Sequence, residues 1–89
     1  MIPKQVEQVL NRYSRLLLEA GASPNRHLTA ATLPAKASAL SHALWMCEQA
    51  RHHLDTGSWD KAMRWLGFIQ GVLWCFGVAS IDEMKEDNR

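Results

Sequence analysis

Cysteine, surplus charge and long apolar runs are all scarce in this chain, and each scarcity excludes a class of protein. Cys47 and Cys75 are too few and too far apart to form a disulfide framework or a zinc motif, and we expect both to be buried free thiols. Ten basic and nine acidic residues give a formal net charge of +1, without the electrostatic footprint of a nucleic-acid-binding domain. We therefore expect no nucleic-acid partner.

Apolar runs are short throughout the sequence. No run of about 18 apolar residues could span a bilayer, and residues 1–15 lack the uninterrupted apolar segment of a signal peptide. The expected location is the cytoplasm, without a membrane partner. Catalytic motifs are missing too, because neither cysteine has a histidine and a carboxylate at a spacing that would activate it. We expect a protein that is not an enzyme and carries no cofactor.

The composition is that of a folded domain. Hydrophobic residues make up 47% of the chain and charged residues 21%, which is typical of globular proteins. With 89 residues we expect one helical domain, residues 1–89, whose single core is marginal in size. Helices from a second copy would enlarge that core, so the expected state is a homo-oligomer.

Apolar spacing predicts helices over about 3–20, 34–54 and 59–76, and a short one over 81–86. The first helix ends at Gly21 and has Arg12 on its solvent side. Its apolar stripe is Val6, Val9, Leu10, Tyr13, Leu16 and Leu17. Residues 21–32 combine glycine, proline and serine without a sustained period, which predicts a loop.

Short connections then determine how the helices meet. Thr32 or Leu33 is expected to cap the second helix, and "DTGS" (55–58) joins it to the third with Ser58 as N-cap. A connection this short places the two helices side by side. The "SIDE" segment (80–83) has the spacing of a capping box. The predicted fold is all-α, a small helical bundle built on an antiparallel helical hairpin.

The helix over 59–76 has two apolar faces. One is an ordinary core stripe of Ala62, Trp65, Leu66, Ile69, Val72, Leu73 and Phe76. The opposite face groups Arg64, Gly67, Gly71 and Trp74, with Phe68, Gln70 and Cys75 on its flanks. Each glycine inside a helix costs roughly 1 kcal/mol relative to alanine, so two of them indicate a close approach to the backbone.

Three occupants would explain this glycine face. The first helix of the same chain could pack there, a second copy could pair there, or Arg64, Gln70 and Trp74 could bound a groove for a ligand or partner protein. Arg64 is the most informative of these residues, because a fixed guanidinium can hold a phosphate or carboxylate with two hydrogen bonds.

Several other side chains have two interpretations each. Glu48 and His52 lie four residues apart on one helical face, but zinc needs three or four ligands, so we expect no metal and solvated histidines at 42, 52 and 53. His42 and Trp45 either extend an exposed aromatic surface or, as we favour for Trp45, cover the edge of the core. Tyr13 is expected at the core edge rather than against a ligand.

Three segments resemble a family of small, uncharacterised helical proteins of tailed bacteriophages and prophages: "HALWMCEQA" (42–50), "KAMRWLGFIQGVLW" (61–74) and "SIDEMKEDNR" (80–89). The resemblance covers roughly the C-terminal half and implies a phage accessory protein in a bacterial cytoplasm. The positions it implies to be shared are His42, Trp45, Met46, Arg64, Trp65, Gly67, Gln70, Gly71, Trp74, Asp87 and Asn88.

The leading functional hypothesis is a non-enzymatic, homo-oligomeric phage protein that binds a phage or host protein, such as a host enzyme or a defence component, through its aromatic surface. One alternative is a binder or sequestering sponge for a nucleotide-like anion, using Arg64, Gln70 and a stacking tryptophan or Tyr13. Another is a virion or packaging component. A purely structural helical module is the simplest alternative to all three.

Overall fold

The structure, a computed structural model, describes residues 2–24 and 35–87. In these two segments it contains helices and no strand: α1 (Pro3–Glu19), α2 (Lys36–Asp55), α3 (Trp59–Cys75) and α4 (Ile81–Asp87). The all-helical prediction is confirmed. α2 begins at Lys36 with Ala35 as its N-cap, so the expected cap at Thr32 or Leu33 is wrong. Thr32, Leu33 and most of the expected 21–32 loop lie outside the described residues.

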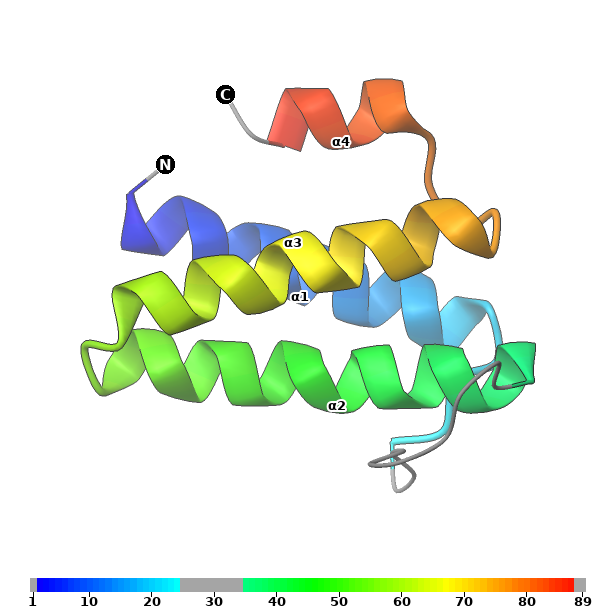
Figure 1. Ribbon diagram of the computed structural model, residues 1–89, viewed down its shortest axis with the longest axis horizontal. Coiled ribbons are helices and arrows are strands. Elements are labelled where there is room, and N and C mark those ends of the chain that lie inside the picture. Colours follow the sequence, from blue (N-terminus) through cyan, green and yellow to red (C-terminus); the bar gives the residue numbers. More distant parts are fainter. Residues whose placement is uncertain (1, 25–34, 88–89) are drawn as a thin grey trace.

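α2 is the helix around which the others are arranged. It packs along both α1 and α3, and three residues, 56–58, connect it to α3. Figure 1 shows α3 in front of α1, with α2 along one side of the pair and α4 along the other. One side of α3 therefore faces the rest of the chain, and the other side faces outward.

A glycine follows each of the three longer helices and ends it in the same way. Gly77 has a φ of +73°, a left-handed conformation that suits glycine because it lacks a Cβ atom. The amide of Val78 donates to the carbonyl of Leu73 at 2.8 Å, which satisfies one of the last carbonyls of α3. Gly21, the predicted stop of α1, has a φ of +101° and makes the corresponding end there.

The start of α4 is held by the predicted capping box. The Glu83 amide donates to Ser80 Oγ at 3.1 Å, and the Ser80 amide donates to Glu83 Oε1 at 3.3 Å, so two amides at the helix start are satisfied. The start of α3 is different, because Ser58 occupies the N-cap position but its side chain makes no capping hydrogen bond.

The core forms where one face of each helix meets. α4 contributes Met84 to this core, and the largest fully buried side chains come from α1, α2 and α3. They are Val6, Leu10, Tyr13, Leu17, Leu40, Cys47, Leu66, Ile69 and Leu73. Burying a side chain of this size contributes about 1.5–3 kcal/mol to folding. Trp45 is partly buried against this core, which confirms the expectation that it covers the core edge.

Two expectations about burial are wrong. Cys75 is exposed, because it lies on the outward side of α3 rather than on the core side. Tyr13 is fully buried instead of lying at the core edge, because its hydroxyl finds partners inside the protein. A helical period identifies a face, but it does not say how deeply the neighbouring helices cover that face.

Arg51, a partly buried charged residue of α2, has a defined partner. Its Nη1 atom donates to Ser14 Oγ at 3.0 Å, and Ser14 Oγ donates to the carbonyl of Leu10 at 2.9 Å. The side chain of Arg51 therefore links α2 to α1. In the described parts of the chain, no helix has the length and hydropathy needed to cross a membrane.

Candidate functional site

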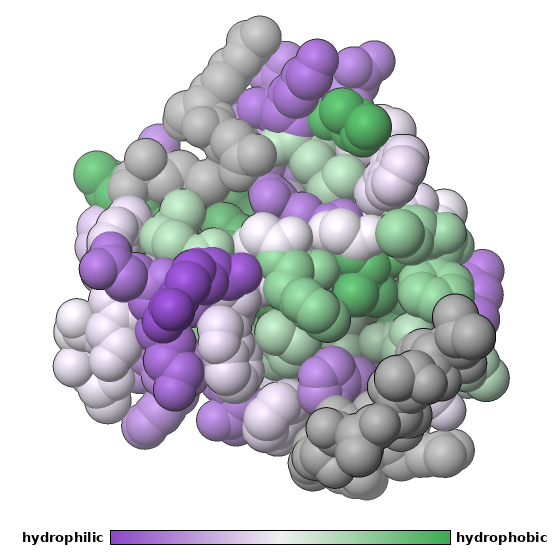
Figure 2. Space-filling model, viewed as in Figure 1, coloured by the Kyte–Doolittle hydropathy of each residue, from purple (hydrophilic) through white to green (hydrophobic). Residues whose placement is uncertain are grey.

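The outward side of α3 carries large apolar side chains that no other part of the described chain covers. We call it the open face. It consists of Arg64, Gly67, Phe68, Gly71, Trp74 and Cys75, all exposed. Phe68 is 56% exposed and Trp74 is 55% exposed, although a solvent-facing helix surface normally carries charged and polar residues there. Figure 2, which views this side, shows hydrophobic residues gathered where α3 runs toward its C-terminus.

The two glycines leave the middle of the open face flat. A Cβ atom built on Gly67 or Gly71 would meet nothing within 4 Å among the described residues. α1 therefore does not pack into the glycine face, and the interpretation in which the first helix fills it is wrong. The physical reason is that α1 packs against α2, on the side of α3 that carries its buried residues. A second copy, and a ligand or partner protein, remain as candidate occupants.

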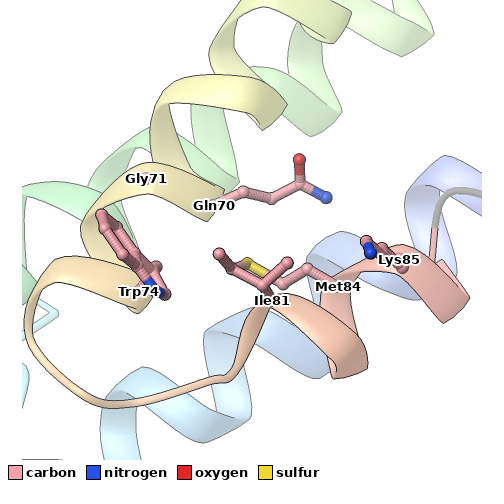
Figure 3. A pocket seen from close by; sticks show the side chains of 6 residues that line it. All are labelled: Gln70, Gly71, Trp74, Ile81, Met84 and Lys85. Atoms are coloured by element: carbon pink, nitrogen blue, oxygen red, sulfur yellow. The ribbon is translucent and has the colours of Figure 1, made fainter.

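A shallow pocket continues the open face toward α4. Its volume is about 250 Å³, and it is lined by Gln70, Gly71, Trp74, Ile81, Met84 and Lys85. Figure 3 shows Trp74 and Lys85 at opposite ends, with Ile81 and Met84 between them. Ile81 is 49% exposed, so the apolar surface of Trp74 extends onto α4. The pocket can receive an apolar group and offers one cation at its edge.

Gln70 connects this pocket to a buried polar network. Its Nε2 atom donates to the hydroxyl of Tyr13 at 3.1 Å, and that hydroxyl donates to Asp87 Oδ2 at 2.6 Å. Asp87 also forms an ion pair with Arg12. Arg12, expected on the solvent side of its helix, is therefore partly buried, with 33% of its side chain exposed. The network ties α4 to α1 and α3.

Tyr13 is held in its neutral form by this environment. Burial is the main cause that raises the pKa of its hydroxyl, and the hydrogen bond to the Asp87 carboxylate raises it further. The hydrogen bond from Gln70 and the charge of Arg12 act in the opposite direction. The hydroxyl therefore remains a donor to Asp87 at neutral pH. Tyr13 acts as a structural link, and it does not line the pocket.

A separate cluster of aromatic rings lies where α2 meets α3. The ring centroids of His42 and Trp45 are 5.5 Å apart, those of Trp45 and Trp65 are 5.8 Å apart, and those of Trp65 and His53 are 4.9 Å apart in an edge-on arrangement. Lys61 Nζ lies 5.8 Å from the centroid of the Trp65 ring. Such contacts add to the apolar burial of these rings, so the cluster strengthens the packing of α2 on α3.

His53 departs from the expectation of solvated histidines. It is half-buried against Trp65, and its Nε2 atom is buried without a hydrogen-bond partner, whereas His52 is exposed. Burial first, and then the charges of Lys61 and His52, lower the pKa of His53, which favours the neutral ring. Within residues 2–24 and 35–87, no group of three or more histidine, cysteine or acidic side chains could hold a metal ion.

The structure distributes the eight predicted site residues over four places. Gln70, Gly71 and Trp74 line the pocket, and Arg64 and Gly67 lie on the open face outside it. Tyr13 is buried beneath Gln70, while His42 and Trp45 belong to the aromatic cluster. Arg64 does not line this pocket, so the pocket contains Gln70 and Trp74 from the predicted groove without Arg64.

Sequence reasoning did not find the contribution of α4 to the site. Ile81, Met84 and Lys85 form one wall of the pocket, and Asp87 fixes α4 to the rest of the protein. A signal was present in the spacing of Ile81 and Met84, which lie three residues apart and so share one face of a short helix. What the local sequence could not show is which other helix that face would meet.

Comparison with known proteins adds no relative to this description. No family model, curated protein or solved structure matches the chain.

Proposed function

We propose that this chain is a non-enzymatic binding protein that receives another polypeptide on the open face of α3. The observation that carries the proposal is the exposure of Phe68 and Trp74 beside the uncovered backbone of Gly71. Ile81 extends the same apolar surface. Exposed apolar surface rimmed by polar residues is typical of protein interaction sites, and aromatic side chains carry much of the binding energy at such sites.

The scaffold of this proposal is an antiparallel hairpin of α2 and α3. The three-residue connection at 56–58 and the packing of α2 along α3 support it. Such a hairpin holds the backbone of α3 rigid while its outer side stays available, and binding to a rigid surface costs little ordering entropy.

The cellular setting is proposed from the resemblance to small helical proteins of tailed bacteriophages. It supports a phage accessory protein in the bacterial cytoplasm, with a phage or host protein among its partners.

A binding role also agrees with the state of Cys47, which is fully buried and whose pKa is raised to about 11 by burial. A thiol in that state is protonated at neutral pH and is a poor nucleophile.

The proposal is tested by asking whether the open face is covered in a cell. A photo-crosslinking phenylalanine analogue replaces Phe68 in the full chain, which is produced in bacteria with and without phage infection. The matched control carries the analogue at Asn11, an exposed position on α1. We expect covalent adducts from position 68 and none from position 11. No adduct at position 68 under either condition would contradict the proposal.

A second candidate function is the binding of a nucleotide-like anion in the pocket. The arrangement that favours it is the placement of Trp74 and Lys85 at opposite ends of the pocket, because an indole can stack on a base while an ammonium group holds a phosphate. A ligand present at about a hundred times its dissociation constant stabilises a protein by roughly 2.7 kcal/mol. Unchanged melting temperatures across linear and cyclic nucleotides would exclude this candidate.

A further inference from the structure

The open face has a pattern that complements itself. We propose that its occupant is a second copy of this chain, and that two α3 helices cross in antiparallel orientation about a two-fold axis at the level of Ile69. This inference rests on the proposed function, because it names the polypeptide that covers the open face. A two-fold contact uses the same surface on both copies, so every residue must suit the residue placed opposite it.

The middle of the crossing consists of glycine. With the axis at the level of Ile69, Gly67 of one copy lies opposite Gly71 of the other. Neither glycine has a neighbour within 4 Å of its Cβ position among residues 2–24 and 35–87, so no described side chain fills the space directly above either glycine. Packed helices are usually 8–10 Å apart, depending on the side chains between them, and glycine permits the short end of this range. The glycines permit the approach, and the apolar and charged residues around them select the partner.

The same register places Arg64 of each copy opposite Trp74 of the other. Both side chains are exposed, so the guanidinium can lie over the indole ring. A cation over an aromatic face contributes about 0.5–1 kcal/mol at an exposed site and more when water is excluded, and the pairing occurs twice in a symmetric dimer. In a parallel pair, Arg64 would instead face Arg64 of the second copy, and the helix dipoles would be aligned unfavourably.

Charges at the two ends of α3 favour the same orientation. The N-terminal half of α3 carries two basic residues, Lys61 and Arg64, against one acidic residue, Asp60, whereas α4 begins beyond the C-terminal end of α3 with Asp82 and Glu83. Antiparallel pairing brings the basic half of each α3 helix toward the acidic start of α4 in the other copy. Opposite charges that meet across an interface select the correct orientation and accelerate association. The net charge of +1 leaves little repulsion between whole copies.

Cysteine cross-linking of the purified protein tests both the partner and its orientation. In a Cys75→Ser background, Gly67→Cys and Gly71→Cys are prepared as separate variants and oxidised alone and after mixing. A disulfide requires Cα atoms within about 7 Å, which facing positions at a close crossing satisfy. In the same arrangement, position 67 of one copy and position 67 of the other are displaced by four residues, about 6 Å along the helix, in addition to the separation between the helices. Gly67→Cys alone should therefore not form this disulfide.

We expect a covalent dimer in the mixture and none when either variant is oxidised alone. Asn11→Cys in the same background is the matched control and should remain uncross-linked. Circular dichroism confirms that each variant is folded, as expected because neither Cβ meets a neighbour. Cross-linking of each variant with itself would show a parallel pair and overturn the orientation.

Absence of cross-links, together with a monomeric mass for the parent protein, would overturn the second copy as occupant. The proposed function fails by a different result, since it requires adducts from position 68 in cells. Adducts there that contain another polypeptide, combined with a monomeric purified protein, would retain the binding role and reject pairing with a second copy.

Discussion

The two sides of α3 differ in how their residues are used, although both are apolar. On the packed side, Leu66, Ile69 and Leu73 are at most 1% exposed and fill the space against the other helices. On the open face, Phe68 and Trp74 are more than half exposed and flank glycines whose Cβ positions have no described neighbour within 4 Å. The packed side therefore determines whether the chain folds, and the open face is available for what it binds. Substitutions on the two sides should separate these effects.

The largest effect is expected on the packed side. Ile69→Ala removes a fully buried side chain and leaves a cavity that the surrounding helices fill incompletely, which costs roughly 2–5 kcal/mol of unfolding free energy. Urea denaturation followed by circular dichroism measures the loss. A change below about 1 kcal/mol would show that this side is less tightly packed than described.

The next effect concerns the buried thiol of α2. Burial raises the pKa of Cys47 from 9.0 to about 11 in the folded protein, against lowering effects of Ser14 and Arg51. The folded state therefore holds this proton more tightly than the unfolded state. The free energy of unfolding therefore keeps the full contribution of this thiol below pH 9. It falls by about 1.4 kcal/mol per pH unit as the pH rises from 9 to 11. Urea denaturation should show this slope in the parent protein and a shallower one in Cys47→Ala.

A smaller loss is expected from the network that holds α4. Tyr13→Phe removes the hydroxyl between Gln70 and Asp87 and leaves the partly buried side chain of Gln70 without this acceptor. The expected cost is about 1–3 kcal/mol. The amide hydrogens of α4 should exchange faster in the variant than in the parent protein, by a larger factor than those of α2, because Asp87 loses one of its two attachments. Equal protection of α4 in both proteins would argue against this role of Tyr13.

The smallest effect has the opposite sign and belongs to the open face. Gly71→Ala adds a methyl group at a position that no side chain in the described part of the chain approaches within 4 Å, and it removes a glycine from a helix interior. The free energy of unfolding should rise by roughly 0.5–1 kcal/mol at low protein concentration. Urea denaturation monitored by tryptophan fluorescence measures it. Destabilisation of the dilute protein would show that the glycine is required within the chain itself.

Much of the fold could be predicted from local sequence. Gly21 ended its helix as expected, and Ser80 and Glu83 formed the expected capping box, because these signals act within a few residues. The core face of α3 also followed from helical spacing, as Leu66, Ile69 and Leu73 show.

The contacts between distant residues could not be predicted in this way. Asp87 meets Tyr13 across 74 positions of sequence, and no local pattern pairs them. For the same reason Arg12 was placed in solvent and Cys75 in the core. The open face was found from its composition, but the pocket needed α4 in its place, which depends on that long-range network.

Sedimentation velocity of the parent protein and of Gly71→Leu, at several micromolar concentrations, tests the central claim most directly. The account predicts a dimer for the parent protein and a folded monomer for the variant. A leucine on the open face blocks the approach of a second backbone, while its Cβ atom has no neighbour within 4 Å among the described residues. A monomeric parent protein, or a variant that pairs as well as the parent, would contradict the claim.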